Sequence, residues 1–172
     1  MTDEKIVLMG YMGSGKSTVA KLLSEQLNMD MIDLDDYIEK KERSAIPDLF
    51  KHKGENYFRN KEHFYLKQLL DSEREMILSV GGGTPCFSGN IDLINAQAKS
   101  VYLRSSVQSL YKRLLKEKDL RPLIARIPDS ELKEFIDKHL SERTVYYEKA
   151  GIILQTDDKS PEKIVNELIQ LL

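Results

Sequence analysis

Short apolar runs alternate along this chain with amphipathic segments, a pattern typical of a parallel β-sheet covered by helices on both faces. The apolar runs predict strands near residues 5–9, 30–34, 75–80, 99–103 and 151–155. Between them, apolar residues recur at helical spacing, which predicts helices at 16–27, 55–71, 106–117, 130–148 and 161–171. The pattern therefore indicates an α/β fold.

Three helix starts can be read from the sequence. Ser105 with Gln108 fits a capping box, in which both side chains satisfy free backbone N–H groups. Ser160-Pro161 fits an N-cap serine followed by proline at the first helical position. Asp36 is expected to cap a short helix at 36–41.

The most specific motif is Gly10-Tyr11-Met12-Gly13-Ser14-Gly15-Lys16-Ser17, which fits G-x-x-x-x-G-K-[ST] and directly follows an apolar run. Its glycines let successive backbone N–H groups turn toward phosphate oxygens, and the following helix adds the positive end of its dipole. A dinucleotide-binding turn is disfavoured because the last glycine of G-x-G-x-x-G is missing. We expect a nucleoside triphosphate to be bound here, by Gly13, Ser14, Gly15, Lys16, Ser17 and Thr18.

The length, charge and cysteine content of the chain limit the kinds of partner that we expect it to bind. The 172 residues fit one domain, and a net charge of −2 with interspersed signs argues against a protein that coats nucleic acid. No apolar stretch approaches the ~18 residues of a membrane span, and no signal peptide is evident. The single cysteine, Cys86, excludes an internal disulfide and favours a reducing compartment. We therefore expect a cytoplasmic monomer that binds a small molecule, with no nucleic-acid or membrane partner.

Two carboxylates, Asp33 and Asp35, close the second apolar run. In an extended strand, side chains two residues apart point the same way, so both would face one side at the carboxyl edge of the sheet. Ligands bind at that edge in folds of this kind. One carboxylate could hold Mg²⁺ or its waters, while the other removes a proton from an acceptor hydroxyl.

A second glycine-rich segment, Gly81-Gly82-Gly83, follows the third predicted strand and would let a substrate lie against backbone N–H groups. Three arginines, Arg59, Arg121 and Arg143, have the planar guanidinium group that pairs with carboxylate or phosphate. The alternative is that each is a solvated surface charge. The charged, proline-containing segment 116–130 is typical of a mobile lid.

In this order, the motifs closely resemble those of the shikimate kinase family over nearly the whole chain. The similar residues are the phosphate-binding loop, Asp33-Leu34-Asp35, Gly54-Glu55 through Phe58-Arg59, Gly81-Gly82-Gly83 and Arg121-Pro122-Leu123. The resemblance implies ATP-dependent phosphoryl transfer to the 3-hydroxyl of shikimate, giving shikimate 3-phosphate and ADP, in chorismate and aromatic amino acid biosynthesis.

The resemblance also implies an architecture. It is a P-loop nucleoside-triphosphate-hydrolase-like three-layer sandwich, with a five-stranded parallel sheet of order 2-3-1-4-5 and helices on both faces. Residues 1–172 would form a single kinase domain. Its substrate-binding segment would span about 33–62 and its lid about 114–128.

On the acceptor side, the resemblance implies that Asp35 binds the substrate hydroxyls and acts as the base. Arg59 and Arg143 would bind the shikimate carboxylate, and the backbone of Gly81, Gly82 and Gly83 would contact the substrate. Glu62, one helical turn after Arg59, would orient that arginine.

On the nucleotide side, the resemblance implies that Asp33 and Ser17 hold Mg²⁺. Lys16 and Arg121 would stabilise the transferred phosphate, and Arg113 would stack on adenine.

Two other functions remain open. The chain could phosphorylate another small acceptor, such as gluconate or a nucleoside monophosphate, although Gly81-Gly82-Gly83 disfavours the adenylate type. A nucleotide-dependent switch is disfavoured because the guanine-reading motif N-K-x-D and the γ-phosphate-sensing motif D-x-x-G are absent from the sequence. A degenerate binding module is disfavoured because the P-loop lysine, both carboxylates and the lid arginine are all present.

Overall fold

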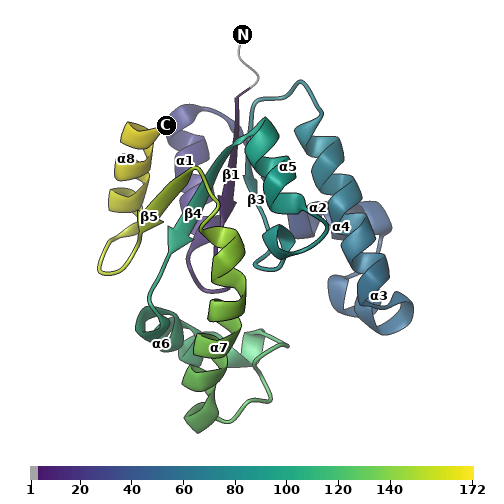
Figure 1. Cartoon of the computed structure of the whole chain (residues 1–172), viewed down its shortest axis with the longest axis vertical. Helices are drawn as coiled ribbons and strands as arrows, with labels where there is room; N and C mark the ends of the chain where they lie inside the picture. The colour runs from purple at the N-terminus through teal and green to yellow at the C-terminus, as the bar shows by residue number, and fades with distance from the viewer. Residues whose placement is uncertain (1–3) are drawn as a thin grey trace.

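The protein forms a five-stranded sheet between two layers of helices in the computed structural model, which describes residues 4–172 (Figure 1). Every neighbouring pair of strands is parallel, and the strand order is β2-β3-β1-β4-β5. This confirms the expected fold class and order. The strands are β1 (Lys5–Met9), β2 (Asp30–Asp33), β3 (Met76–Ser79), β4 (Lys99–Arg104) and β5 (Ile152–Gln155).

Eight α-helices and two short 3₁₀ helices connect these strands within the described residues. They are α1 (Lys16–Leu27), α2 (Leu34–Glu42), α3 (Ile46–Lys53), α4 (Glu55–Leu70), η1 (Thr84–Cys86), α5 (Asn90–Gln97), α6 (Val107–Glu117), η2 (Lys118–Leu120), α7 (Asp129–Tyr147) and α8 (Pro161–Leu171). The five main predicted helices are confirmed as α1, α4, α6, α7 and α8. Among residues 4–172, no helix combines the length and apolar composition needed to cross a bilayer.

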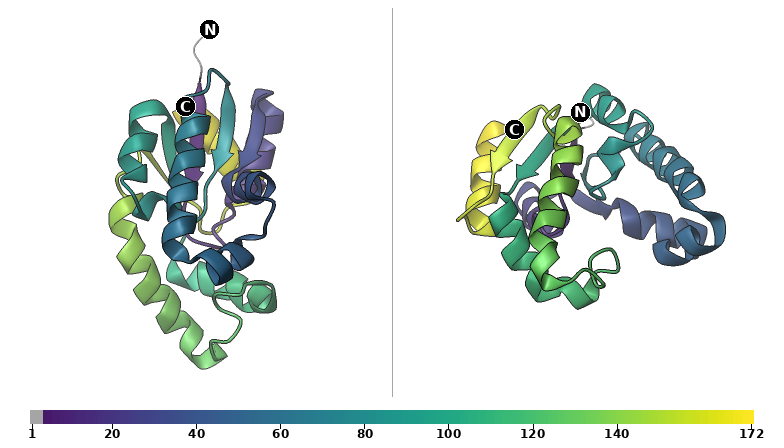
Figure 2. Two further views of the ribbon diagram at one scale, coloured as in Figure 1. Left: turned by 90° about the vertical axis from the view of Figure 1, so that its right-hand side faces the viewer. Right: turned by 60° about the horizontal axis from the view of Figure 1, so that its bottom comes forward.

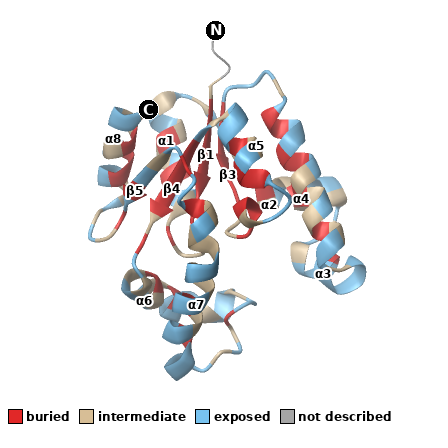
Figure 3. Cartoon of the chain, in the orientation of Figure 1, coloured by how far each residue is buried: buried red, intermediate tan, exposed pale blue. Residues whose placement is uncertain are grey.

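The central strand β1 divides the hydrophobic core in two, because alternate side chains of a strand point to opposite faces. Ile6 and Leu8 pack with residues of α1 and α8 on one face of the sheet. Val7 and Met9 pack with residues of α4, α5 and α7 on the other. All of β1 is buried, and Figure 3 shows the buried strands between helices whose outer faces are exposed.

The parallel sheet brings the expected functional segments to one edge. The phosphate-binding loop follows β1, α2 follows β2 directly, and the three glycines follow β3. Helices α2 and α3 lie on one side of this carboxyl edge, and α6 with the start of α7 lies on the other (Figures 1 and 2).

The prediction that Asp33 and Asp35 lie together on one extended strand is wrong. β2 ends at Asp33, and Asp35 lies in the first turn of α2. Asp33, not Asp36, caps this helix, because its Oδ1 accepts hydrogen bonds from the N–H groups of Asp35 (3.0 Å) and Asp36 (3.3 Å). The chain therefore turns into the helix one residue earlier than the apolar run predicts.

The predicted cap of α6 is also wrong by one residue. Ser106 is the N-cap, and its hydroxyl accepts the N–H of Ser109 at 3.1 Å. Ser105 is buried, and its hydroxyl lies 2.6 Å from that of Thr156. By contrast, Ser160 caps α8 as predicted, since its hydroxyl accepts the N–H of Lys163 at 3.3 Å.

Candidate active site

The phosphate-binding loop connects β1 to α1 in a conformation that requires its glycines. Gly13 and Gly15 have φ angles of 77° and 91°, in the left-handed region that other residues rarely adopt. A Cβ on Gly10 would lie 2.8 Å from the carbonyl oxygen of Leu103, so the loop packs directly against β4. The backbone therefore has the turn that the motif predicts.

Lys16 lies on the inner side of this loop. Its Nζ donates to the carbonyl oxygens of Gly10 at 2.8 Å and Tyr11 at 3.1 Å. Desolvation by burial lowers the pKa of Lys16 to about 8, although the nearby carboxylate of Asp35 opposes the shift. A phosphate oxygen would replace the carbonyls as partner and favour the charged form.

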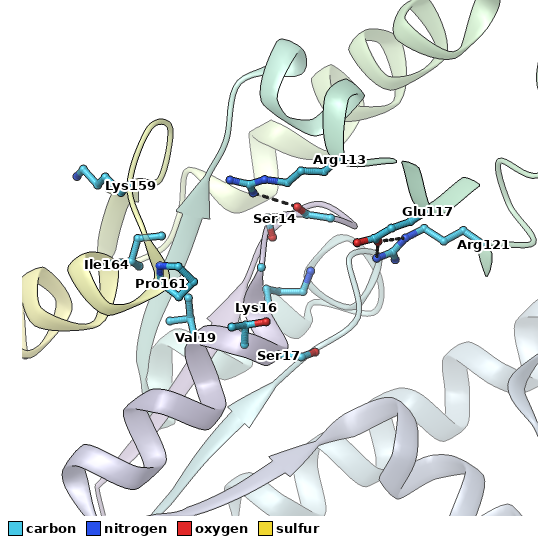
Figure 4. A pocket seen from close by; sticks show the side chains of 13 residues that line it. Ser14, Lys16, Ser17, Val19, Arg113, Glu117, Arg121, Lys159, Pro161 and Ile164 are labelled. Atoms are coloured by element: carbon cyan, nitrogen blue, oxygen red, sulfur yellow. Dashed lines mark hydrogen bonds and ion pairs between the residues drawn. The ribbon is translucent and has the colours of Figure 1, made fainter. Parts of the chain in front are cut away.

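A cavity of about 450 Å³ lies over the loop (Figure 4). Pro161 and Ile164 lie at one end of it, and Glu117 and Arg121 lie at the other. Its lining residues are Gly13, Ser14, Gly15, Lys16, Ser17, Thr18, Val19, Arg113, Glu117, Arg121, Lys159, Pro161 and Ile164. All the residues predicted to bind the triphosphate are therefore brought together.

Arg113 crosses from α6 to this loop, and its Nη1 donates to the carbonyl oxygen of Gly13 at 3.1 Å. Sequence reasoning missed Lys159, Pro161 and Ile164. Ile164 belongs to the apolar stripe of α8, so its spacing indicates only a core position, and Pro161 after Ser160 indicates only a helix start.

A second cavity, of about 610 Å³, adjoins the first. Its polar lining comes from Asp35, Arg59, Glu62, the three glycines and Arg121. Its apolar lining comes from Met12, Ile46, Pro47, Phe50, Phe58, Leu120, Pro122 and Leu123. Arg121 lines both cavities, so the predicted nucleotide and acceptor sites meet at this side chain.

Arg59 is held with its guanidinium group in the second cavity. Its Nη1 donates to Glu62 at 2.8 Å, as the helical spacing predicts, and Glu62 is only 1% exposed. The other carboxylate oxygen of Glu62 accepts the Thr84 hydroxyl at 2.8 Å. The buried Nε of Arg59 makes no hydrogen bond among the described residues, although it forms an ion pair with Oε1 of Glu55 at 3.5 Å. An anionic ligand would supply a partner for this arginine.

The three glycines lie between two arginines that are far apart in sequence. A Cβ on Gly82 would lie 3.0 Å from Nη1 of Arg143, and a Cβ on Gly83 would lie 2.8 Å from Nη2 of Arg59. Because glycine has no side chain, both guanidinium groups approach the backbone of one loop. Arg143, which belongs to α7, is thereby placed near the acceptor cavity although it does not line it.

Asp35 lies beside the first of these glycines, where a Cβ on Gly81 would be 3.2 Å from its Oδ1. Its pKa is raised to about 6 by desolvation and by the negative charges of Asp33 and Glu62, while Lys16 acts in the opposite direction. The carboxylate is therefore mostly ionised at neutral pH and more basic than an exposed aspartate. It can accept a proton from a hydroxyl in the cavity.

Asp33 and Ser17 are the predicted magnesium residues. One oxygen of Asp33 caps α2, and the other makes no hydrogen bond within residues 4–172. Burial raises the pKa of Asp33. The described residues contain no cluster of three or more His, Cys, Asp or Glu that could enclose a metal ion. A divalent cation here would need oxygens from phosphate and water, as Mg²⁺ usually does at kinase sites.

The expected lid follows α6 and carries Arg121. Its Nη2 and Nε donate to Oε2 of Glu117 at 2.6 and 3.1 Å. Leu120 is 83% exposed and Leu123 is 55% exposed, although both line the acceptor cavity. The segment therefore presents exposed apolar side chains beside the acceptor cavity.

Comparison with known proteins gives one family. The family model described as Shikimate kinase matches residues 12–172. Curated shikimate kinases of Flavobacterium psychrophilum and Flavobacterium johnsoniae are each 43% identical over 170 residues, covering 98% of this chain and 99% of theirs. The solved shikimate kinase of Bacteroides thetaiotaomicron is 35% identical, with a TM-score of 0.91 over 98% of this chain and 97% of that one. The Acinetobacter baumannii enzyme, solved in complex with shikimate, is 29% identical, with a TM-score of 0.88 over 99% and 93%.

Proposed function

The chain belongs to the shikimate kinase family, and we propose that it transfers the γ-phosphoryl group of ATP to the 3-hydroxyl of shikimate. The products are shikimate 3-phosphate and ADP. The observation that carries this proposal is the pair of adjoining cavities that share Arg121. One has the lining for a triphosphate, and the other has the charges for a hydroxylated carboxylate.

ATP, the phosphoryl donor in this family, binds along the first cavity. The loop from Gly13 to Thr18 surrounds the phosphates, and Lys16 exchanges its two carbonyl partners for phosphate oxygens. Arg113 stacks on adenine opposite the apolar surface of Pro161 and Ile164, which line the same cavity. Phosphoryl transfer requires little covalent chemistry of a protein, so alignment and charge neutralisation provide most of the rate enhancement.

Shikimate binds in the second cavity. Its carboxylate pairs with Arg59 and Arg143, and the backbone of Gly81–Gly83 contacts the ring. Asp35 binds the 3-hydroxyl and accepts its proton. As the new bond forms between the 3-oxygen and γ-phosphorus, the bond from phosphorus to the β,γ-bridging oxygen breaks and ADP leaves.

We propose Ser17 and Asp33 as the residues that hold Mg²⁺, Ser17 through its hydroxyl and Asp33 through water. The oxygen of Asp33 left free by the helix cap supports this assignment. When bound, the cation supplies positive charge to the β- and γ-phosphate oxygens.

Closure of the lid completes the site. Arg121 leaves Glu117 and pairs with the transferred phosphoryl group, opposite Lys16. Closure also brings the exposed Leu120 and Leu123 over the acceptor, which excludes water that would otherwise hydrolyse ATP.

ADP release from ATP and Mg²⁺ tests the function directly. Shikimate should support strong turnover, whereas gluconate, AMP and a control without acceptor should not. Turnover with gluconate instead would retain the kinase and overturn the roles of Arg59 and Arg143. Hydrolysis without any acceptor would indicate an ATPase or a switch.

We also propose that the protein acts as a single-domain monomer in the cytoplasm, without a nucleic-acid or membrane partner. The interspersed charges and the single cysteine support this assignment. Light scattering coupled to size-exclusion chromatography would test it, since a dimer would elute with twice the mass of the chain.

A further inference from the structure

We propose that Tyr147, the last residue of α7, is a positioning residue for acceptor binding, because its hydroxyl fixes the peptide between Gly82 and Gly83. This inference rests on the proposed function, in which that loop contacts shikimate. Tyr147 lies outside the motifs that the sequence analysis identified, and it touches neither cavity. It would act only through the loop and through its neighbour Arg143.

The contact is a partly buried hydrogen bond between distant parts of the chain. The Tyr147 side chain is fully buried, and its Oη donates to the carbonyl oxygen of Gly82 at 2.5 Å across 65 positions of sequence. Its ring packs on Tyr102 of β4, with ring centroids 5.0 Å apart. Burial raises the pKa of the phenol, so the hydroxyl keeps its proton and remains a donor at physiological pH.

The Gly82 carbonyl differs from the carbonyls of Gly81 and Gly83 in the kind of hydrogen-bond donor that it accepts. The Gly81 and Gly83 carbonyls accept backbone N–H groups of Thr84 at 3.0 Å and Cys86 at 2.9 Å, within the local turn. The Gly82 carbonyl instead accepts the Tyr147 hydroxyl at 2.5 Å, together with a longer and weaker hydrogen bond from the Cys86 thiol at 4.0 Å. Since glycine peptides rotate easily, the orientation of this peptide depends on the side chain of α7.

The orientation of the peptide between Gly82 and Gly83 also sets the direction of a hydrogen-bond donor, the N–H group of Gly83. The peptide is planar and trans, so the N–H of Gly83 points away from the carbonyl of Gly82. Because the carbonyl points at Tyr147, the N–H points away from that hydroxyl. Gly81, Gly82 and Gly83 all line the acceptor cavity, so a rotated peptide would present different polar groups to the acceptor.

Tyr147 also lies beside the proposed carboxylate-binding arginine. A Cβ on Gly82 would be 3.4 Å from Oη of Tyr147 and 3.0 Å from Nη1 of Arg143. Arg143 and Tyr147 are four residues apart on α7, so they lie on one face of that helix. One turn of helix therefore supplies both the arginine and the hydroxyl that holds the loop next to it.

Replacing the hydroxyl alone separates positioning from packing. In Tyr147→Phe the ring still fills its place against Tyr102, but the Gly82 carbonyl loses its short hydrogen bond and keeps only the long one from the Cys86 thiol. Loss of a single hydrogen bond of ordinary strength changes an equilibrium constant by about two- to tenfold. We expect KM for shikimate to rise by about three- to tenfold, with kcat and KM for ATP within about twofold of wild type.

Calorimetric titration with shikimate in the absence of nucleotide should show the same loss of affinity. Tyr146→Phe is the matched control, because that neighbouring hydroxyl makes no hydrogen bond with the described part of the chain and should leave every parameter unchanged. Thermal unfolding of both variants monitors the fold.

Three results would distinguish a positioning role for Tyr147 from no role or a purely structural role, and from a failure of the proposed function. Wild-type affinity for shikimate in Tyr147→Phe would overturn the positioning role. Equal losses in ATP and shikimate binding, together with a lower melting temperature, would also overturn it and leave a purely structural role. Absence of shikimate-dependent turnover in the wild-type protein would instead refute the proposed function.

Discussion

Asp35 shows, at the scale of one residue, how chemistry and stability oppose each other in this site. Its carboxylate is desolvated and lies near two other negative charges, so its ionised form is disfavoured in the folded protein. The same environment makes it a stronger base at neutral pH. Removing its charge should therefore have opposite effects on activity and on stability.

Asp35→Asn should lower kcat by about 10²–10⁴-fold, the range expected for loss of a general base. The KM for ATP should stay within about threefold, because we propose that the triphosphate binds in the other cavity. Steady-state kinetics at saturating shikimate would measure both, with the exposed neighbour Asp36→Asn as a control. An unchanged kcat would remove Asp35 from the mechanism.

The stability of the same variant should depend on pH. In the wild type, the folded-state pKa of about 6 exceeds the reference value of 3.8, so folding loses stability as pH rises from about 4 to above 6. Asp35→Asn should therefore melt on the order of a few degrees higher than wild type at pH 7.5. The difference should be small near pH 4, where the carboxyl of the folded wild type is protonated and uncharged. Calorimetric melting curves at the two pH values would measure it, and a lower melting temperature at pH 7.5 would contradict the argument.

Arg59→Lys and Arg143→Lys keep the positive charge but lose the planar pair of donors. Each should raise KM for shikimate by about tenfold or more, and change KM for ATP little. Arg74→Lys, on the surface beside Asp30, provides a matched control. If both active-site variants retain the wild-type KM for shikimate, the carboxylate is bound elsewhere.

At the scale of elements, the segment proposed as a lid is tied to the end of α6 by an ion pair. Glu117 binds Arg121 at the junction, and it also lines the cavity in which the phosphates would lie. In the proposed closure, Arg121 would therefore exchange its ion pair with Glu117 for one with the transferred phosphoryl group. Since the pair is partly exposed, its contribution is small, about 0.2–1 kcal/mol.

Glu117→Gln should lower the Kd for ATP by up to about fivefold, because it releases Arg121 and removes a negative charge near the phosphates. Glu134→Gln is a suitable control, since this exposed residue of α7 forms no ion pair within residues 4–172. Binding titrations at low and high salt would check the origin of the effect, which should shrink as salt rises. Weaker binding in Glu117→Gln would mean that the carboxylate contributes to the site.

Sequence patterns predicted the strands and the long helices because each of these carries its own periodicity. Helices α3 and α5 were missed, since each has only eight residues and their N-caps, Ala45 and Gly89, make no side-chain capping bond. The start of α2 was misplaced because Asp33-Leu34-Asp35 continues the alternation of a strand, while the actual signal is the carboxylate of Asp33 folding back on the next turn.

The residues of the site also divide into those with a local sequence signal, which could be predicted, and those without one. The phosphate-binding loop is contiguous in sequence, so its residues and its geometry could be predicted together. Arg59 and Arg143 were expected to act as a pair only from a resemblance, because nothing local shows that both reach the same glycine loop. Thr84 and Tyr147 gave no signal, since their roles lie in contacts with residues far away in the chain.

At the scale of the whole molecule, the parallel sheet places two binding cavities side by side and one arginine between them. Because Arg121 lines both cavities, the proposed closure could respond to a ligand in either one. A ligand that draws Arg121 inward prepares the neighbouring cavity, so binding of nucleotide and acceptor should be coupled.

The unreactive pair ADP and shikimate would measure this coupling. The Kd for shikimate should fall several-fold in saturating ADP and Mg²⁺, and by linkage the Kd for ADP should fall by the same factor in saturating shikimate. In Arg121→Ala both factors should approach one. Arg126→Ala is a control within the same segment, because Arg126 lines neither cavity. Full coupling in Arg121→Ala would show that communication follows another route.

The absence of side chains at Gly82 and Gly83 affects how easily resistance to an inhibitor of this protein could arise by mutation. Few substitutions at these two residues could prevent binding of a compound that contacts them. Even alanine at Gly82 would place a methyl group 3.0 Å from the guanidinium group of Arg143, and alanine at Gly83 would place one 2.8 Å from that of Arg59. A mutation that prevents inhibitor binding at these positions would also displace an arginine that we propose binds the natural acceptor. Contacts with Leu120 or Leu123, whose side chains are exposed, could be lost by mutation with far less penalty to the cell.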